Sequence, residues 1–246
     1  LNAQKWYGGN PNGGPSLFPD NSLISSYNDI AYGAGTWVAV CESSTGGNTA
    51  IVYTSPNGIA WTQRNAAAAN SWRAVAYGNG WFVAVSSNGT NRVMRSQDGV
   101  SWISASAAEA NSWNGIATDG AGTWIAVAST GTNRAMVSTD NGATWTASNI
   151  GSRTWESIEY GNGVWVAKAP GHLKRSTDNG GSWASEFAGS VSLSLIGRPA
   201  YGNGKFVVIG YDSGASSSSV YTSADGISWA LVAVASGYGS CVGFGL

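Results

Sequence analysis

The residues with the clearest chemistry in this sequence are tryptophans that stand ahead of Asn-Arg pairs. Trp72 precedes Asn91-Arg92, and Trp113 precedes Asn133-Arg134. An indole offers a flat apolar surface to the C–H side of a pyranose ring, while amide and guanidinium groups hydrogen-bond sugar hydroxyls. We therefore predict a carbohydrate site formed by Trp72, Asn91, Arg92, Trp113, Asn133, Arg134 and Trp155. In the alternative interpretation, the tryptophans cap the core and the Asn and Arg side chains stabilise their own loops.

The sequence identifies no catalytic residue, metal site or cofactor. A glycosidase needs two carboxyl groups about 5 to 10 Å apart across the scissile bond. Outside a recurring Ser-x-Asp-x-Gly-x-x-Trp motif, the acidic residues stand singly along the chain, apart from Glu156 and Glu159. His172 has no Ser or Cys nucleophile motif around it, so we interpret it as a solvated loop residue. No residues have metal-ligand spacing, and no glycine-rich loop opens a helix.

A motif of the form Ser-x-Asp-x-Gly-x-x-Trp, with small variations, sets the spacing of the chain. One copy is Ser138-Thr-Asp-Asn-Gly-Ala-Thr-Trp145. A motif that returns at a nearly fixed period marks a repeat architecture, in which one supersecondary unit is copied along the chain. We call the five copies the Asp-Gly turns, and they span residues 55–61, 96–102, 138–145, 176–183 and 223–229.

Each repeat divides into four short strands. In the second repeat we expect them at 74–77, 82–85, 92–95 and 102–104. Gly78-Asn-Gly80 between β-branched and aromatic residues predicts a tight hairpin, because Gly and Asn accept positive φ readily. No repeat contains ten or more residues with helical spacing of apolar positions. The sequence therefore predicts an all-β fold, a β-propeller of four-stranded antiparallel blades.

Five complete repeats leave the two chain ends to be placed within a single domain over residues 1–246. The ends, 1–26 and 238–246, carry fragments that match parts of a further repeat. We therefore favour six blades, the sixth assembled from both ends, because closure removes exposed strand edges. A five-bladed ring is the alternative. The complete blades are expected at about residues 27–65, 70–106, 112–149, 154–187 and 196–234.

The chain has two cysteines, Cys41 and Cys241. If the chain ends close the ring, both fall at the same height in neighbouring blades. A disulfide between them would then stabilise the ring by restricting the unfolded chain. The alternative is two buried free thiols.

The aspartates of the Asp-Gly turns are expected to be structural. A turn aspartate accepts hydrogen bonds from nearby backbone N–H groups, and the glycine takes the positive φ. One carboxylate per loop is too few for calcium, which takes six to eight oxygen ligands. The aspartates are Asp98, Asp140, Asp178 and Asp225, with Asn57 in the first copy.

Two sets of aromatic residues are expected in the core. The tryptophan that ends each Asp-Gly turn should pack its outer strand onto the next blade. A second aromatic recurs in the second strand of every blade, where it should fill the space between sheets. These second-strand residues are Trp37, Phe82, Trp124, Trp165 and Phe206.

The Asp-Gly turn resembles the Asp-box, or BNR repeat, of sialidase-like propellers. Paired with the Tyr-Gly-Asn-Gly-x-Phe-Val-Ala motif, it is similar to repeat proteins of bacteriophage tails and bacterial exported proteins. The resemblance covers about residues 27–235. It implies that the Asp-boxes are structural and lie away from a catalytic face. Sialidases carry an arginine triad and a tyrosine nucleophile paired with a carboxylate, and no flanking motif identifies these here.

The order of strands separates the two faces of the predicted propeller. If the hairpins that join strands one to two and three to four share one face, the remaining loops and the blade-to-blade connections share the other. Trp72, Trp113 and Trp155 stand on this second face, where sequence variation is greatest. We therefore expect binding on the face opposite the Asp-Gly turns.

Composition narrows the classes of partner. Charged residues make up 10% of the chain and the net charge is −1, so no basic footprint indicates nucleic acid or an anionic membrane. The apolar runs are too short for membrane insertion, and the chain begins without a signal-peptide pattern. The low charge and many Ser, Thr, Asn, Gly and Trp residues favour an extracellular or virion location.

Three functions of different classes follow. The first is a non-catalytic recognition module, extracellular or on a virion, that binds a glycan or a cell-surface receptor. The second is a structural or protein-interaction propeller among the subunits of a virion or exported assembly. The third is a sialidase-like glycoside hydrolase. The sequence favours a non-catalytic function over an enzyme, because it offers no recognisable set of catalytic residues.

Overall fold

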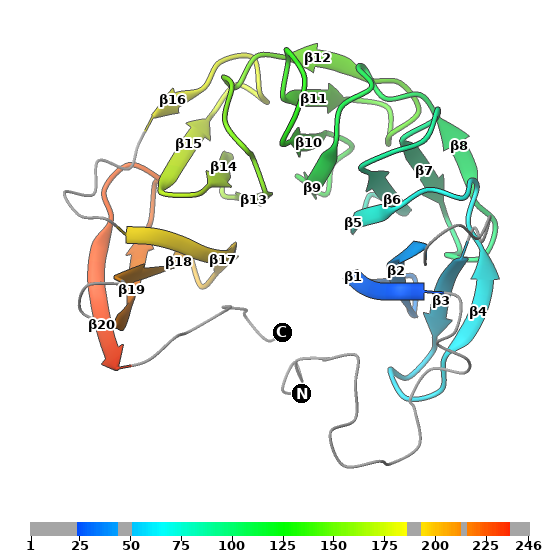
Figure 1. Cartoon of the computed structure of the whole chain (residues 1–246), viewed down its shortest axis with the longest axis horizontal. Coiled ribbons are helices and arrows are strands. Elements are labelled where there is room, and N and C mark those ends of the chain that lie inside the picture. The colour runs from blue at the N-terminus through cyan, green and yellow to red at the C-terminus, as the bar shows by residue number, and fades with distance from the viewer. Residues whose placement is uncertain (1–23, 44–50, 186–192, 213–215, 237–246) are drawn as a thin grey trace.

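The computed structural model describes residues 24–43, 51–185, 193–212 and 216–236. This part of the chain is all-β and contains no helix. Its strands form five antiparallel sheets of four, each in chain order (Figure 1). The strands are β1 (Ile24–Gly33), β2 (Thr36–Ser43), β3 (Ile51–Ser55), β4 (Thr62–Asn65), β5 (Trp72–Gly78), β6 (Trp81–Ser86), β7 (Val93–Ser96), β8 (Ile103–Ala105), β9 (Trp113–Thr118), β10 (Trp124–Ala128), β11 (Ala135–Ser138), β12 (Thr146–Ser148), β13 (Ser157–Gly161), β14 (Val164–Ala169), β15 (His172–Ser176), β16 (Ala184–Ser185), β17 (Leu193–Gly202), β18 (Lys205–Asp212), β19 (Ser217–Ser223) and β20 (Ala230–Ser236).

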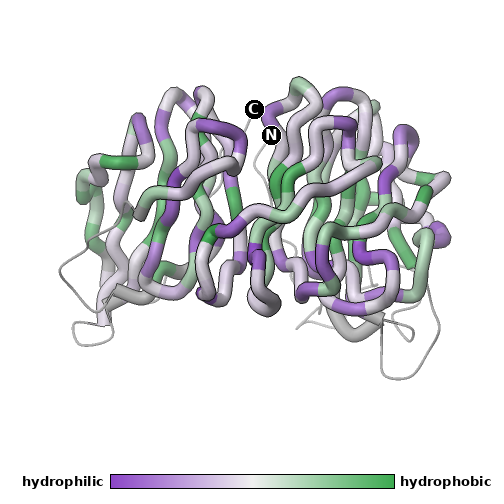
Figure 2. The backbone as a smooth tube through the Cα atoms, turned by 90° about the horizontal axis from the view of Figure 1, so that it is seen from above, coloured by the Kyte–Doolittle hydropathy of each residue, from purple (hydrophilic) through white to green (hydrophobic). Residues whose placement is uncertain are grey.

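The five sheets are the blades of a propeller. Blades 1 to 5 comprise β1–β4, β5–β8, β9–β12, β13–β16 and β17–β20, and the first strand of each lies nearest the centre (Figure 1). The predicted all-β propeller of four-stranded antiparallel blades is confirmed. Apolar residues lie along the strands, and hydrophilic residues gather in the turns at the two faces (Figure 2).

The sixth blade remains a prediction. Residues 1–23 and 237–246 lie outside the described residues, whereas residues 24–26, which we expected to help close the ring, belong to β1. Cys241 also lies outside the described residues, so the disulfide with Cys41 is untested. The Cys41 thiol is buried and donates to the Ile51 carbonyl at 3.4 Å, and burial raises its pKa to about 12.

Short sequence signals set the hairpins that join the first two strands of the blades. The turn between β5 and β6 has φ of 49° at Asn79 and 79° at Gly80. Asn162-Gly163 and Asn203-Gly204 repeat this pair of positive φ angles. Two successive positive φ values match the right-handed twist of the flanking strands, and Asn-Gly adopts them with little strain. The Gly-Asn-Gly signal therefore predicted these turns correctly.

The core lies between the blades. Phe82, Trp124, Trp165 and Phe206 are fully buried, as expected, and Trp37 is half-buried. The expected direction of the turn tryptophans was wrong in blades 3 and 4, where they pack onto the preceding blade. Trp145 joins a cluster with Val83 and Val85 of blade 2, and Trp183 joins one with Ile125 of blade 3.

The turn glycines explain this direction. A Cβ on Gly99 would lie 2.6 Å from Val38 of blade 1, and one on Gly142 would lie 2.9 Å from Val83 of blade 2. The Asp-Gly turns of blades 2 to 5 therefore rest on the second strand of the preceding blade, whereas the turn glycine of blade 1, Gly58, lies nearest Trp37 of its own blade.

Candidate functional site

The three tryptophans predicted to stack on sugar are buried. Trp72, Trp113 and Trp155 are 1%, 0% and 0% exposed. Each indole N–H donates to a carbonyl four residues earlier, on Ala68, Glu109 and Gly151, at 3.1, 3.1 and 2.9 Å. Their rings fill the core where one blade connects to the next, so the structure offers no indole face to a ligand. The stacking role was wrong for these side chains, and they cap the core.

The predicted arginines hold loops. The Arg92 guanidinium donates to the carbonyls of Ser87 at 3.3 Å, Gly89 at 2.9 Å and Asn111 at 2.7 Å. The Arg134 side chain donates to the Gly131 carbonyl at 3.0 Å. Arg92 thereby ties its own loop to the connection between blades 2 and 3.

The predicted asparagines are also part of the loop framework. The Asn133 side-chain amide donates to a Glu109 carboxylate oxygen at 2.6 Å, and this hydrogen bond lowers the pKa of Glu109. The Asn91 side-chain oxygen accepts from Ser106 at 3.3 Å. The predicted residues of blades 2 and 3 therefore stabilise this face.

A different pair of asparagines closes the surface in those blades. Asn70 and Asn111 are 5% and 4% exposed, and each lies two residues before a buried tryptophan. The Asn70 amide donates to the Asn91 carbonyl at 2.6 Å, and the Asn111 amide donates to the Asn133 carbonyl at 2.6 Å. The two side chains fill the space between the blade connection and the loops 87–92 and 129–134.

Blade 4 departs from this pattern at the same place. The residue two positions before Trp155 is Arg153, which is exposed. The loop between β14 and β15 is reduced to the turn 170–171, so it contributes nothing equivalent to the loops 87–92 and 129–134. The asparagine that fills this space in blades 2 and 3 and the longer loop are both missing.

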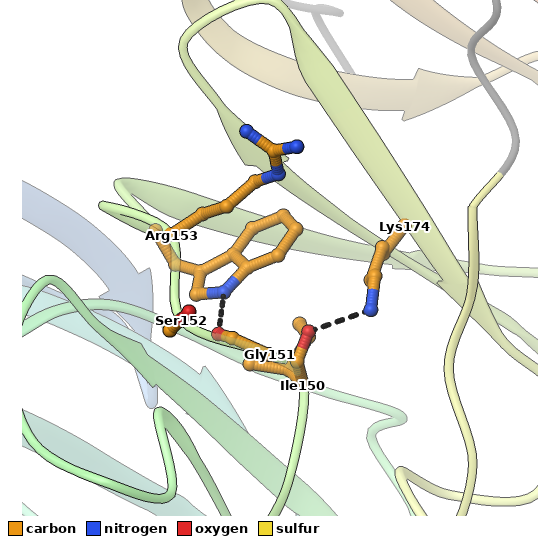
Figure 3. A pocket seen from close by; sticks show the side chains of 6 residues that line it. Ile150, Gly151, Ser152, Arg153 and Lys174 are labelled. Atoms are coloured by element: carbon orange, nitrogen blue, oxygen red, sulfur yellow. Dashed lines mark hydrogen bonds between the residues drawn. The ribbon is translucent and has the colours of Figure 1, made fainter.

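A pocket of about 290 Å³ occupies this part of blade 4 (Figure 3). It lies between the connection from blade 3 and the strand β15, on the face opposite the Asp-Gly turns. The Lys174 ammonium donates to the Ile150 carbonyl at 2.8 Å. The lining residues are Ile150, Gly151, Ser152, Arg153, Trp155 and Lys174.

The charge at the pocket is positive. Within the described residues, the Arg153 guanidinium makes no hydrogen bond or ion pair, and the lining contains no acid. In Figure 3 the Arg153 and Lys174 side chains lie on different sides of the pocket. His172 stands nearby in the β14–β15 hairpin, where partial burial and then the charge of Arg153 lower its pKa. His172 is therefore neutral at pH 7, and Arg153 and Lys174 carry the charge.

A comparison of the repeats could have found these residues in the sequence. The residue two positions before the serine of each Asp-Gly turn is Tyr53, Met94, Met136, Lys174 or Tyr221. A second such position lies three residues after the recurring aromatic of the second strand. It holds Val40, Val85, Val127 and Ile209 in the other blades and Lys168 in blade 4. Charged residues at apolar positions of a repeat cannot be explained by packing, and both fall in blade 4.

A second charged cluster lies on the innermost strands near the centre of the ring. Glu159 occupies a position that is alanine in the other four blades. Arg198 forms an ion pair with Asp29 at 2.7 Å, and Asp29 also accepts from the backbone N–H of Val75 at 2.9 Å. Burial raises the pKa of Glu159 to about 7.

The backbone of β17 directs Arg198 toward this cluster. The pairing of β17 with β18 is interrupted between Ile196 and Ala200, where Gly197 has a φ of 71°. Such bulges bend a strand and redirect a side chain. The ion pair connects the innermost strands of blades 5 and 1, so this cluster joins the two ends of the described arc.

Within the described ranges, no three His, Cys, Asp or Glu side chains are placed together to hold a metal ion. The described segments also contain no helix that is long and apolar enough to span a bilayer.

Comparison with known proteins gives no family by sequence. No protein-family model matches the chain, and no curated protein matches it. Solved structures do match, however. YCF48 bound to a D1 peptide has 18% identity and a TM-score of 0.57, over 83% of this chain and 66% of that one.

Two enzymes share the same architecture. Virginiamycin B lyase from Staphylococcus aureus aligns with 11% identity and a TM-score of 0.68, over 87% of this chain and 72% of the lyase. The GH74 xyloglucanase from Xanthomonas campestris aligns with 15% identity and a TM-score of 0.65, over 87% of this chain and 39% of the xyloglucanase. This chain thus spans just under two thirds of the YCF48 chain and less of the xyloglucanase. At these identities the likeness shows the fold alone, and this chain has a β-propeller fold.

Proposed function

We propose that this chain is a non-catalytic recognition module, extracellular or on a virion, that binds carbohydrate in the pocket of blade 4. The observation that carries the proposal is the opening of this one blade on the face opposite the Asp-Gly turns. In blades 2 and 3, asparagines and loops fill the same space on that face. A pocket of about 290 Å³ is at the small end of ligand sites, which suits one sugar unit of a longer chain.

The polar character of the pocket supports a sugar. Backbone carbonyls, the Ser152 hydroxyl and two cationic side chains surround it. Sugar hydroxyls need both donors and acceptors, and this lining supplies them. Trp155, which is buried, also lines the pocket.

A bulky side chain at Ser152 tests the proposal. Ser152 is exposed on the pocket lining, so Ser152→Trp should fill the pocket without disturbing the core. The matched control is Ala110→Trp, because Ala110 is the exposed residue three positions before Trp113, as Ser152 is before Trp155. On a glycan array, the unmodified chain and Ala110→Trp should give the same signal and Ser152→Trp should lose it.

Two results would contradict the proposal. One is an array on which the unmodified chain binds no glycan. The other is equal binding by Ser152→Trp and the control, which would move the site elsewhere. Release of reducing sugar from the bound glycans would instead support the glycoside hydrolase.

A specific observation favours the second candidate, a structural or protein-interaction propeller. The outer strand β20 exposes Leu231, Val232 and Val234, and their exposed fractions are 54%, 56% and 61%. It carries no charge, whereas β4, the outer strand of blade 1, is short and polar. An uncharged apolar edge strand can pair with the same strand of a second copy. The propeller YCF48, which was solved with a bound D1 peptide, supports this candidate.

The protein-interaction function is tested by measuring whether the chain self-associates in solution. Val232→Lys adds a charge to β20, which should prevent edge pairing. Sedimentation velocity over a range of concentrations should then show a dimer for the unmodified chain and a monomer for the variant. A monomer in both would exclude pairing through β20.

A further inference from the structure

We infer that the blade 4 pocket binds an anionic group, the carboxylate or sulfate of an acidic sugar, through Arg153 and Lys174. The inference rests on the proposed carbohydrate function and names the chemical class of its ligand.

The pocket arises by the loss of neutral side chains and the gain of a charged one. In blades 2 and 3 the position two residues before the capping tryptophan is a buried asparagine that is bonded to a neighbouring loop. In blade 4 this position is Arg153, and the neighbouring loop is shortened to the turn 170–171. The same change that opens the space therefore places a guanidinium beside it.

The cations retain donors for a ligand. Arg153 has five N–H donors, and none is bonded to a described residue. Lys174 gives one of its three to the Ile150 carbonyl. The Glu156 carboxylate, which follows Trp155 directly, is paired with the Lys168 ammonium at 2.5 Å and so does not neutralise the pocket. Charge-assisted hydrogen bonds to an oxyanion are about twice as strong as neutral ones.

Lys174 stands where packing favours an apolar side chain. Tyr53, Met94 and Met136 occupy the equivalent position in blades 1 to 3 and are fully buried. Partial burial at this position removes water from the Lys174 ammonium, which costs free energy that an apolar side chain would not lose. Its placement is explained if it meets an anion, and Ser152 stands beside it on the lining to bond the hydroxyls of the same sugar.

The test removes one charge at a time. Lys174→Met restores the residue of blades 2 and 3, so the variant should fold. Arg153→Gln removes an exposed charge that has no bonded partner among the described residues. Arg134→Gln is the matched control, because Arg134 lies on the same face in blade 3 and its side chain, among the described residues, bonds only its own loop. Circular dichroism melting verifies that all three are folded.

Binding is measured by titration calorimetry on the full chain with four probes. Oligogalacturonate supplies carboxylates, a chondroitin sulfate oligosaccharide supplies sulfates, maltohexaose is neutral, and oligoglutamate is an acidic peptide. We expect binding of one or both acidic sugars and none of maltohexaose. Arg153→Gln and Lys174→Met should each weaken it about ten-fold, the loss of one charge-assisted bond, and Arg134→Gln should not change it. The two acidic sugars distinguish carboxylate from sulfate.

The outcomes separate the inference from the proposed function. Glycan binding that is lost in Ser152→Trp but unchanged in Arg153→Gln and Lys174→Met would overturn the anion site and leave the carbohydrate module standing. Tighter binding of oligoglutamate than of any sugar would overturn the inference in favour of a protein partner. Absence of glycan binding by the unmodified chain would overturn both.

Discussion

Single side chains in the Asp-Gly turns replace the backbone partners that a tight turn lacks. One Asp98 carboxylate oxygen accepts from the Ser96 hydroxyl and from the N–H groups of Val100 and Ser101, each at 2.8 Å. The Trp102 indole then donates to the Gly99 carbonyl at 3.0 Å. These bonds, first among them the one from Ser101, lower the pKa of Asp98 to about 2.

Blade 1 shows that a neutral acceptor can make the same bonds. The Asn57 side-chain oxygen accepts from the N–H groups of Ile59 and Ala60, both at 2.9 Å. We therefore predict that Asp98→Asn changes the free energy of unfolding by less than about 1 kcal/mol at pH 7. Asp98→Ala should cost about 1–3 kcal/mol, because several donors lose their acceptor. Urea denaturation measures both values, and equal losses in the two variants would contradict this account.

The same turn predicts an acid dependence. Because the folded pKa of Asp98 lies below the value of about 3.9 in an unfolded chain, its stabilising contribution is present above pH 4 and is lost as the pH falls toward 2. Asp178, whose pKa is also lowered to about 2, should behave alike. The unfolding free energy of Asp98→Asn should consequently fall less between pH 5 and pH 2.5 than that of the unmodified chain. Parallel curves would show that Asp98 does not titrate in this range.

The pKa shift of Glu159 has the opposite sign to that of Asp98, so it predicts the opposite dependence of stability on pH. Burial raises its folded pKa to about 7, above an unfolded value near 4.3, so folding favours its protonated form. The stability contributed by that form is complete below about pH 4 and is lost as the pH rises through 7. Glu159→Gln should therefore melt at a higher temperature than the unmodified chain at pH 8, and the two should converge at pH 4. Calorimetric melting across this range measures it, and a constant difference would contradict the raised pKa.

Blade 4 shows how one element can depart from a repeat and keep its fold. Its strands pair in the same register as those of the other blades, and Trp165 remains fully buried. Two of its apolar positions are lysines, and one of these, Lys168, is almost completely buried. Its ammonium meets the Glu156 carboxylate, which is 43% exposed.

The equivalents of Lys168 predict a stabilising substitution. Val40, Val85 and Val127 stand at this position in blades 1 to 3 and are fully buried. Lys168→Val removes the desolvation cost of the ammonium and leaves Glu156 free to hydrate, so it should stabilise the chain by about 1 kcal/mol. Chemical denaturation provides the measurement. Lys168→Ala, which leaves a void, is the control and should be less stable than Lys168→Val.

Across the whole molecule, the described blades are held in sequence by contacts between neighbours, and one ion pair links the first blade with the last. Arg198 of β17 and Asp29 of β1 are far apart in the chain. The Asp29 side chain is 14% exposed and that of Arg198 is 46% exposed. The pair is therefore partly desolvated, and its loss should affect the molecule as a whole.

A double-mutant cycle tests this link. Arg198→Gln and Asp29→Asn should each lower the free energy of unfolding, and their coupling energy should be about 1 kcal/mol, as expected for a partly exposed pair. High salt should reduce the coupling. Arg153→Gln is the matched control, because it removes an arginine that has no bonded partner among the described residues and should leave stability unchanged. A coupling energy of zero would mean that the pair does not contribute to closing the arc.

The face on which the pocket opens was predictable from the sequence, whereas of the residues that line the pocket only Trp155 was among those predicted. Strand order alone placed the loops 87–92 and 129–134 opposite the Asp-Gly turns. The predicted stacking role of Trp72 and Trp113 was wrong, because an indole at the start of a strand can face solvent or the core with equal local geometry. Arg153 and Lys174 could have been found by aligning the repeats and asking which blade breaks the pattern. Glu159 stands out in the same way, because its position is alanine in the other four blades, but only the fold brings it together with Arg198 near the ring centre.

The sequence by itself determined the period, the four strands of each blade, the hairpins and the turn aspartates. These features depend on bonds and φ angles among residues within about one turn of each other, so a contiguous motif such as Gly78-Asn-Gly80 encodes them. The tertiary structure decided which tryptophans are buried, the blade that each turn packs against, and where a pocket opens. Burial and cavities depend on which distant residues meet. In blade 4, Arg153 and the shortened loop between β14 and β15 together leave the space that an asparagine fills in blades 2 and 3.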